Sequence, residues 1–342
     1  MNLPLAPPYL PMEAETAEAI PEGPEWQYEP KWDGFRCVAF RDDDEVELQS
    51  KSGQPLTRYF PELAEGLRAL KAKQFVLDGE IVIPLDGNLS FDELLMRIHP
   101  AASRVNKLAK EHPALLIAFD LLVDEAGASL VSDKLKERRA RLEEFAGKYF
   151  EGNKSVGLSP ATRKLTEARQ WYRTMGGGLD GIIAKRTDLE YQSGERGGML
   201  KIKNLRSADC VVGGFRYATK GNVVGSLLLG LYDEAGLLNH VGYTSAFQAS
   251  ERQEITVKLE KLKHGPGFTG RAPGGPSRWS TKRSTEWEPL DPKLVIEVQY
   301  DHFTGGRFRH GTKLLRWRPD KAPEQCRMTQ VELDSKSPMG LL

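Results

Sequence analysis

A lysine flanked by two carboxylates lies early in the chain, in residues 29–36 (EPKWDGFR). The stretch predicts a strand that runs into a tight turn, because Gly34 permits a sharp change of direction. Side chains two apart share one face of a strand, so Glu29, Lys31 and Asp33 project together. Lys31 is therefore a candidate nucleophile for covalent catalysis, although alternating charges on a surface strand are the commoner meaning of such a run.

Further charged stretches follow in a fixed order along the chain. They are Asp78-Gly79-Glu80, Phe119-Asp120, Asp180-Gly181-x-x-x-Lys185, Lys201-x-Lys203 and, near the C-terminus, Arg318-x-Asp320-Lys321. Each has an ordinary interpretation alone: a bulge with solvated carboxylates, a core phenylalanine, an exposed strand face or a charged turn. The ordered set is much more specific than any of its members.

The lysines suggest chemistry at phosphorus. A free lysine has a pKa near 10.4, so only ~0.1% of it is the neutral amine at neutral pH. Nearby cations or a metal ion must lower that pKa before Lys31 can attack. Lys201 and Lys203 lie two apart on a predicted strand, and Lys185 can join them from a neighbouring strand. Such a cationic pocket would hold a triphosphate and disfavour protonation of Lys31.

Two carboxylates in these stretches can bind a metal ion. Glu80 and Asp180 each lie beside a glycine in a predicted strand. Mg²⁺ takes few protein ligands and keeps most of its waters. We therefore expect these two residues to bind Mg²⁺, and the in-line attack to depend on positioning and charge stabilisation.

Strands and helices must hold these residues in place, and the hydrophobic pattern predicts both. Apolar strands are expected at residues 75–83, 114–122, 180–185 and 199–203. Helices are expected at residues 60–70, 91–98, 101–111, 133–145 and 166–175, the fourth with Ser132 as its N-cap. Residues 1–25 are rich in proline and predict an extended lead-in, either packed over a core or loose.

The predicted secondary structure changes from Cys210 onward, where short strands predominate. Short strands are expected at residues 210–215, 226–232, 240–243, 295–300 and 314–317, with one helix at 249–263. Five short strands and one helix are typical of a small barrel such as the OB-fold. Residues 265–285 have the composition of a loop, and their basic side chains are a candidate contact for a polyanion: Arg271, Arg278, Lys282 and Arg283.

Composition limits the class of protein. No run approaches the roughly 20 apolar residues of a membrane-spanning helix. The three cysteines lie far apart without a CxxC pair, which argues against a zinc ribbon or a disulfide scaffold, and we expect a cytoplasmic protein with reduced thiols. The net charge is zero, but the charged residues are unevenly distributed. Residues 1–205 carry 28 Lys+Arg and 33 Asp+Glu, whereas residues 206–342 carry 20 Lys+Arg and 15 Asp+Glu. We expect a polyanion to bind the more basic C-terminal part.

In this order, the charged stretches resemble the nucleotidyltransferase motifs of ATP-dependent DNA ligases, and the match is closest to the stand-alone minimal bacterial type, the ligase C group. The resemblance runs through nearly the whole chain. It implies an α+β fold, in which a nucleotidyltransferase (adenylation) domain of mixed and antiparallel sheets with helices, residues 1–205, precedes an OB-fold β-barrel domain, residues 206–342. It implies an enzyme that seals 5′-phosphate/3′-hydroxyl nicks through lysyl-AMP and an adenylated DNA intermediate, in DNA repair.

The resemblance also implies roles for single residues. Lys31 forms lysyl-AMP, Phe119 stacks on the adenine, Glu29 lies beside the adenine edge, and Arg36 and Glu80 contact the nucleotide around the ribose. The remaining binding or catalytic residues are Lys51, Lys185, Lys201, Lys203, Arg318, Asp320 and Lys321. The last three would orient the β- and γ-phosphates when the second domain folds over the nucleotide. ATP is then a substrate, Mg²⁺ the metal and nicked duplex DNA the partner of a monomer that separate repair proteins recruit.

Two positions depart from the family pattern. Lys51 stands where the family usually carries arginine, and it keeps the charge but loses the planar fork of the guanidinium. Asp180 stands where many relatives have glutamate, which is one methylene longer. The departures put the phosphate contact and the metal contact in question.

Other functions share parts of the pattern. An RNA ligase or an mRNA-capping guanylyltransferase of the same superfamily carries the lysine motif and a similar C-terminal Arg-x-Asp-Lys. A non-catalytic OB-fold protein that binds nucleic acid is a further alternative, opposed by the intact Lys31 and the lysine cluster. Three scattered cysteines cannot form the four-cysteine zinc site of NAD-dependent ligases.

Overall fold

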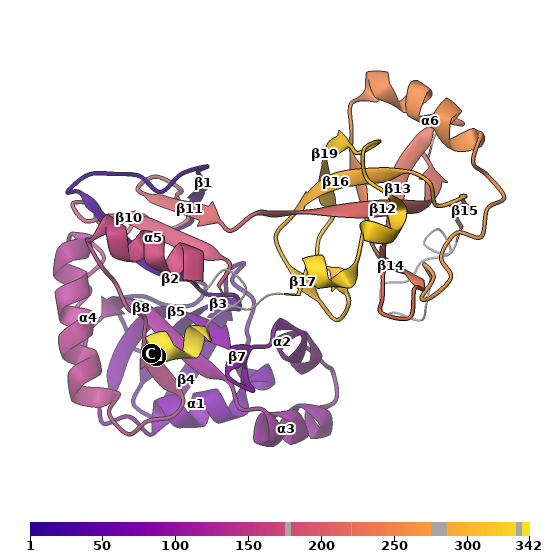
Figure 1. Cartoon of the computed structure of the whole chain (residues 1–342). Helices are drawn as coiled ribbons and strands as arrows, with labels where there is room; N and C mark the ends of the chain where they lie inside the picture. The colour runs from indigo at the N-terminus through magenta and orange to yellow at the C-terminus, as the bar shows by residue number, and fades with distance from the viewer. Residues whose placement is uncertain (175–178, 220, 275–285, 333–336) are drawn as a thin grey trace. The chain divides into compact units, whose positions relative to one another are not determined.

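The computed structural model describes residues 1–174, 179–219, 221–274, 286–332 and 337–342. The chain divides after Asn204 into two compact units, shown in Figure 1. Residues Met1–Asn204 form the first unit together with residues 337–342, and the second unit begins at Leu205. The predicted domains divide one residue later, and the structure differs from them in grouping the last residues of the chain with the first unit.

Two sheets build the first unit. The larger has the strand order β4-β3-β5-β8-β9, and the smaller has the order β1-β11-β10-β2. The larger sheet consists of β3 (Phe35–Asp42), β4 (Glu45–Ser50), β5 (Gln74–Val82), β8 (Leu115–Val123) and β9 (Val156–Leu158). The smaller consists of β1 (Glu15–Thr16), β2 (Trp26–Lys31), β10 (Gly181–Arg186) and β11 (Met199–Lys203). A hairpin of β6 (Pro84–Leu85) and β7 (Asn88–Leu89) follows β5.

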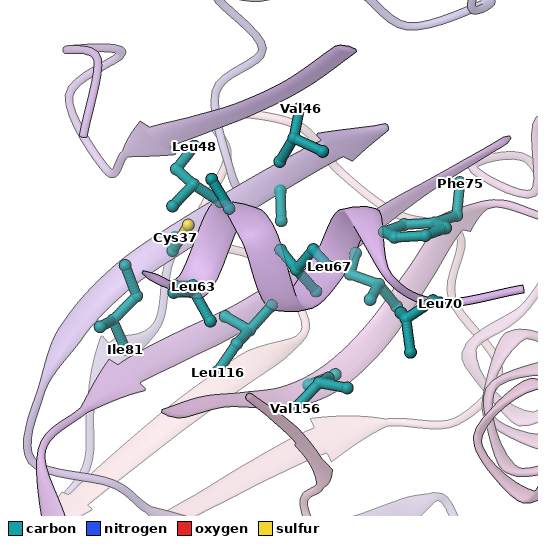
Figure 2. Packing of buried hydrophobic residues seen from close by; sticks show 14 of the residues in the cluster. Cys37, Val46, Leu48, Leu63, Leu67, Leu70, Phe75, Ile81, Leu116 and Val156 are labelled. Carbon is teal, nitrogen blue, oxygen red and sulfur yellow. The ribbon is translucent and has the colours of Figure 1, made fainter. Parts of the chain in front are cut away.

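Helices cover the outer face of each sheet. The helical elements of this unit are α1 (Pro61–Arg68), α2 (Phe91–Arg97), α3 (Ala102–Glu111), α4 (Leu135–Tyr149) and α5 (Leu165–Thr174), with short 3-10 turns η1 (Thr57–Tyr59) and η5 (Pro338–Leu341). Leu63 and Leu67 of α1 pack with Cys37 and Leu116 in the main core, as Figure 2 shows. On the smaller sheet, Trp171 of α5 packs in one cluster with residues of β2, β10 and β11. The inner faces of both sheets are thereby left to line a site.

The proline-rich lead-in is packed rather than loose. Met12 is buried beside Val38 and Met199, and β1 pairs in parallel with β11. Tyr9 exchanges two hydrogen bonds with Gln49, its N–H donating to Oε1 over 2.8 Å and its carbonyl accepting from Nε2 over 2.7 Å. The lead-in therefore belongs to the fold of the first unit.

The fourth predicted helix starts later than expected. Its N-cap is Lys134 rather than Ser132, and it extends to Tyr149 instead of ending at residue 145. The Glu137 carboxylate accepts a hydrogen bond of 3.1 Å from Lys134 N–H, which fixes the first turn there. A tertiary contact adds to this, because Leu135 N–H donates to the carbonyl of Leu189 over 2.8 Å.

The second unit is a small barrel. Its sheet has the order β13-β14-β19-β16-β12-β15, and an additional pairing of β13 with β12 closes it. The strands are β12 (Arg206–Tyr217), β13 (Val224–Tyr232), β14 (Leu238–Ala246), β15 (Glu288–Pro289), β16 (Val295–Tyr300) and β19 (Thr312–Trp317), with a hairpin of β17 (Phe303–Thr304) and β18 (Arg307–Phe308). The helical elements are η2 (Ala249–Glu251), α6 (Arg252–Glu260), η3 (Pro323–Gln325) and η4 (Met328–Gln330). Among the described residues, no helix is long and apolar enough to cross a membrane.

The predicted basic loop is only partly described. Arg278, Lys282 and Arg283 lie outside the described residues. Arg271 has a structural task, because its guanidinium donates to the carbonyls of His240, over 3.1 Å, and of Gly305, over 3.2 Å. Its donors therefore hold two barrel segments together in this structure.

Candidate active site

The register of the smaller sheet gathers the predicted lysines on one face. Lys31 and Lys203 both lie opposite Gly181, and Lys201 lies opposite Ile183. Side chains of directly paired residues share a face, and Lys185 lies two residues after Ile183. These four lysines therefore project from the same side of the sheet, the one opposite α5.

Gly181 makes this arrangement possible. Its φ is +139°, and a Cβ there would lie 1.9 Å from the carbonyl oxygen of Ile202. Only glycine fits so close to a neighbouring strand. The glycine of the Asp-Gly pair thus sets the approach of β10 to β11.

Lys31 is held by Asp180. Its Nζ contacts Asp180 Oδ2, and Asp180 N–H donates to the Lys31 carbonyl over 2.9 Å. The Lys31 side chain is 21% exposed. This ion pair binds the protonated amine, so the pair has to separate before a neutral amine can attack an electrophile.

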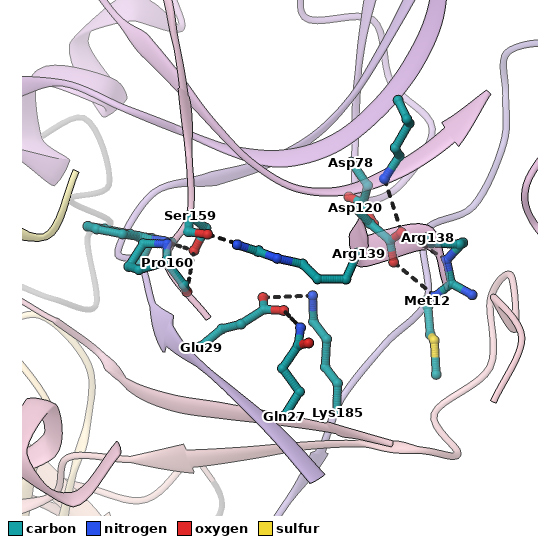
Figure 3. Close-up of polar contacts among 12 residues, drawn as sticks. Met12, Gln27, Glu29, Asp78, Asp120, Arg138, Arg139, Ser159, Pro160 and Lys185 are labelled. Carbon is teal, nitrogen blue, oxygen red and sulfur yellow. Dashed lines mark hydrogen bonds and ion pairs between the residues drawn. The ribbon is translucent and has the colours of Figure 1, made fainter. Parts of the chain in front are cut away.

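A buried chain of three polar residues lies beside Lys31. Lys185 Nζ is 2.7 Å from Glu29 Oε2, close enough for an ion pair but without hydrogen-bond geometry. Gln27 Nε2 donates to the other carboxylate oxygen of Glu29 over 2.9 Å. Figure 3 shows the chain of contacts from Gln27 through Glu29 to Lys185. Sequence reasoning missed Gln27, which only its position two residues before Glu29 on the strand could have indicated.

Phe119, on β8 of the larger sheet, lines the other side of the pocket that lies between the two sheets. Lys185 Nζ and Arg36 Cζ each lie 4.5 Å from the centre of its ring. The neighbouring Asp120 is not at the pocket surface: it binds Arg138 of α4 through two hydrogen bonds of 2.8 and 3.0 Å. The Phe-Asp pair therefore combines a wall residue with a buried structural carboxylate.

Arg36 is fixed by a second buried carboxylate. Its Nε and Nη2 donate to the two oxygens of Asp78, each over 2.6 Å. Tyr191 OH donates to Asp78 Oδ2 over 2.6 Å, and Met12 N–H donates to Tyr191 OH over 3.0 Å. Among the described residues, Arg36 Nη1 makes no hydrogen bond. The sequence had no signal for Tyr191, because it lies in a loop without a motif.

Glu80 lies opposite Arg36 in the β3–β5 ladder and lines the same pocket. Burial raises its pKa to about 7, against the opposing effect of Lys31 and Arg36. Its carboxylate makes no hydrogen bond or ion pair within the described part of the chain. An unpaired carboxylate at a pocket surface is suited to a cation.

The pocket between the two sheets has a cavity volume of about 80 Å³. Its lining comes from β2 and β10 on one side and from β3, β5 and β8 on the other: Glu29, Lys31, Arg36, Glu80, Phe119, Ile183 and Lys185, with Met199 of β11. This volume is smaller than that of a typical small-molecule site, so a nucleotide would have to displace lining side chains to enter. The described residues contain no group of three His, Cys, Asp or Glu side chains arranged to hold a metal ion.

A positive cluster continues from the pocket. Partial burial lowers the pKa of Lys201, and the nearby charges of Lys51, Lys31, Lys203 and Arg196 lower it further. Glu13 of the lead-in offsets part of this charge, since its carboxylate pairs with Lys51 over 3.1 Å and with Arg196 over 3.2 Å. The cluster is suited to a polyanion such as a phosphate chain.

The C-terminal charged residues lie in the second unit. Arg318 Nη2 binds Asp320 over 2.8 Å, and its Nη1 binds Asp209 of β12 over 2.8 Å. Lys321 Nζ binds the same Asp209 carboxylate over 2.6 Å. The three predicted residues form one network, together with an aspartate that sequence reasoning missed.

Comparisons with known proteins agree across both units. A family model described as ATP dependent DNA ligase domain matches residues 11–203, and one described as ATP dependent DNA ligase C terminal region matches residues 220–321. DNA ligase C of Mycobacterium tuberculosis is 43% identical, covering 97% of this chain and 96% of its own length. The multifunctional non-homologous end joining protein LigD of Mycobacterium bovis is 32% identical, covering 88% of this chain and 37% of its own.

A solved structure is similar in fold. It comes from a structure-function study of DNA binding with a minimal scaffold by Lig E DNA ligases, and has a TM-score of 0.55 at 17% identity. The match covers 91% of this chain and 99% of the other. At this identity the similarity concerns the fold alone.

Proposed function

The chain belongs to the family of ATP-dependent DNA ligases, and on that premise we propose how its residues carry out the reaction. Lys31 Nζ attacks the α-phosphorus of ATP, the bond to the bridging oxygen breaks, and pyrophosphate leaves lysyl-AMP behind. The 5′-phosphate of a nick then attacks this phosphorus and frees Lys31. The 3′-hydroxyl finally attacks the DNA 5′-phosphorus, which joins the strand and releases AMP.

The observation that carries this proposal is the shared face of β2, β10 and β11, with Lys31 at the pocket and further lysines beside it. Lys201 and Lys203 bind the phosphates and stabilise charge that develops at the α-phosphorus. Lys185 contributes a third positive charge from the pocket wall. Lys31 must part from Asp180 and lose a proton before it attacks.

The nucleotide occupies the pocket. Phe119 stacks on the adenine, and Glu29 lies beside the edge of the base. Because Lys185 and Arg36 both contact the Phe119 ring, the base has to displace one of them. Arg36 uses the Nη1 group that is not engaged by Asp78 for the ribose, next to Glu80.

Glu80 and Asp180 are the proposed Mg²⁺ ligands. The unpaired Glu80 carboxylate fits a divalent cation. Asp180, whose carboxylate contacts Lys31 in this structure, is the proposed second ligand. Mg²⁺ needs few protein ligands, in agreement with a site of two carboxylates. Bound there, the ion would neutralise charge on the phosphate oxygens.

The remaining proposed contacts concern phosphates and DNA. Lys51, in the positive cluster, binds a phosphate of the nucleotide or the nick. Arg318, Asp320 and Lys321 orient the β- and γ-phosphates in the first step. The similarity to an end-joining protein supports a role in DNA repair, on nicked duplex DNA as substrate.

Labelled ATP tests the assignment of the nucleophile. The protein is incubated with Mg²⁺ and α-labelled ATP, and acid-labile label on the chain is measured before and after nicked DNA is added. Lys31→Ala should abolish labelling, whereas Lys71→Ala, at an exposed lysine after α1, should label normally. Acid-labile label on the Lys31→Ala protein would falsify the proposal.

A further inference from the structure

Asp209 joins the two cations of the C-terminal charged motif. Its Oδ1 accepts from Arg318 Nη1 over 2.8 Å, and its Oδ2 accepts from Arg318 Nη1 over 3.0 Å and from Lys321 Nζ over 2.6 Å. The Asp209 side chain is 11% exposed. One nearly buried carboxylate therefore serves two positive side chains.

The backbone of Asp209 is fixed on both sides. In the β12–β16 ladder it lies opposite Glu297. The Gln330 side chain accepts from Asp209 N–H over 3.1 Å and donates to its carbonyl over 3.2 Å. The carboxylate thus projects from a rigid strand position, which is the kind of support that fixes a functional side chain.

The two cations depend on Asp209 to different degrees. Arg318 keeps a second carboxylate, because its Nε and Nη2 also bind Asp320, over 3.0 and 2.8 Å. Within the described residues, Lys321 Nζ has Asp209 as its one ion-pair partner. A lysine side chain is flexible, and it loses much rotamer freedom when it is held in one position. The ion pair with Asp209 therefore fixes the position of the Lys321 ammonium.

We propose that Asp209 is a positioning residue for the first step of ligation, holding Arg318 and Lys321 in the arrangement that receives the leaving pyrophosphate. The inference rests on the proposed role of those two residues toward the triphosphate. In this role Asp209 acts through Arg318 and Lys321 and not by its own contact with ATP or DNA. Its negative charge also offsets the repulsion between two cations that share one carboxylate.

Asp209→Asn, which preserves shape and removes the charge, tests the inference in single-turnover assays. Lysyl-AMP formation from ATP should slow by about tenfold or more, because Lys321 loses its charged partner. Sealing of a nick that already carries 5′-AMP needs no triphosphate and should change less than about twofold. This second assay also reports whether the variant folds and binds DNA.

Glu297→Gln provides a matched control. Glu297 lies opposite Asp209 on the next strand and pairs with Arg316 over 2.6 Å, so the change removes a similar ion pair from the same sheet. Both steps should remain near the wild-type rates. Equal losses in the two assays for Asp209→Asn, or no loss in the first, would overturn the inference.

A double-mutant cycle separates positioning from a general structural effect. If Asp209 acts through its two partners, Asp209→Asn should add little loss of lysyl-AMP formation to an Arg318→Ala/Lys321→Ala protein. An additive loss would contradict the inference. If Arg318→Ala and Lys321→Ala themselves leave lysyl-AMP formation intact, the proposed role of the motif fails. If they impair it and Asp209→Asn does not, only the inference about Asp209 fails.

Discussion

Tyr191 donates its hydroxyl hydrogen to Asp78 Oδ2 over 2.6 Å, and the same carboxylate holds Arg36 through two hydrogen bonds. The Tyr191 hydroxyl also accepts from Met12 N–H over 3.0 Å. The proline-rich lead-in is thus connected through a tyrosine and an aspartate to an arginine in the pocket wall. Burial and the nearby charge of Asp78 raise the pKa of Tyr191, so the phenol remains a donor at neutral pH.

Tyr191→Phe removes this donor while the ring stays in place. Arg36 then loses part of its support, and the KM for ATP in lysyl-AMP formation should rise by about three- to tenfold, with a smaller change in kcat. The free energy of unfolding should fall by about 1–3 kcal/mol, because Met12 N–H loses its partner. Urea unfolding and the ATP dependence of labelling measure the two effects.

Tyr28→Phe is the control for this change. Tyr28 is also buried, and its hydroxyl donates to the Pro21 carbonyl over 2.7 Å, away from Arg36. The Tyr28→Phe variant should be less stable than wild type, and its KM for ATP should be unchanged. The same rise in KM in both variants would show that the Tyr191 hydroxyl has no particular effect on Arg36.

Glu80 predicts a dependence of stability on pH. Its pKa rises from 4.5 to about 7, chiefly through burial, so the folded protein holds a proton that the unfolded chain releases near pH 4.5. Protonation of Glu80 therefore stabilises the folded state; this contribution is fully present below pH 4.5 and is lost as the pH rises through 7. Glu80→Gln lacks it, so the stability of the variant relative to wild type should increase by roughly 1–3 kcal/mol from about pH 5 to pH 8.

Chemical denaturation at three pH values measures this difference. The same variant should have lost metal-dependent lysyl-AMP formation, since a carboxamide cannot replace the charged ligand. Parallel stability curves for the two proteins would contradict the raised pKa. Added Mg²⁺ should shift the wild-type stability at pH 8 and leave Glu80→Gln unchanged.

Gly34 is required by a close approach of strands. A Cβ at this position would lie 2.2 Å from the Ile81 carbonyl oxygen and 2.9 Å from Glu80 Cγ. Gly34→Ala should therefore move β3 away from β5, lower the midpoint of thermal unfolding and abolish lysyl-AMP formation. Gly147→Ala in α4, where the added carbon meets no atom within 4 Å apart from its own helix backbone, should instead stabilise the protein by about 0.5–1 kcal/mol. Equal stability of the two variants would refute the steric argument.

The hydrophobic pattern of the sequence predicted much of this architecture. The strands at 199–203 and 295–300 have the observed bounds, and the α+β class, the barrel and the DNA ligase resemblance are confirmed. The similarity to DNA ligase C along the chain sets aside the alternatives of an RNA ligase, a capping enzyme and a non-catalytic binding protein. Lys31 and its neighbours were predicted as site residues because an ordered set of motifs follows the chain, and their roles stay a prediction.

Supporting residues were not found, for a physical reason. Tyr191 and Asp209 contact residues far along the chain, and no spacing rule encodes such pairs. Gln27 contacts Glu29 on the same strand, and only its spacing of two residues could have indicated it. The two-residue strand β1 was missed as well, because its pairing with β11 is a tertiary contact of an otherwise irregular segment. Sequence reasoning thus identified groups suited to chemistry, and the structure adds the groups that hold them.

The last prediction concerns the ion pair between Glu29 and Lys185, in which the side chains are 2% and 8% exposed. Glu29→Gln leaves Lys185 buried without a charged partner, and the free energy of unfolding should fall by about 3–5 kcal/mol. Adding Lys185→Met removes the uncompensated charge and should recover most of that stability, because a methionine fills the same space beside Phe119. In the double variant, the rate of lysyl-AMP formation should stay at least about a hundredfold below wild type, since the charges of both Glu29 and Lys185 are removed from the pocket. Urea unfolding and single-turnover labelling of both single variants and the double variant complete the cycle. Recovery of activity together with stability would show that the pair serves folding alone.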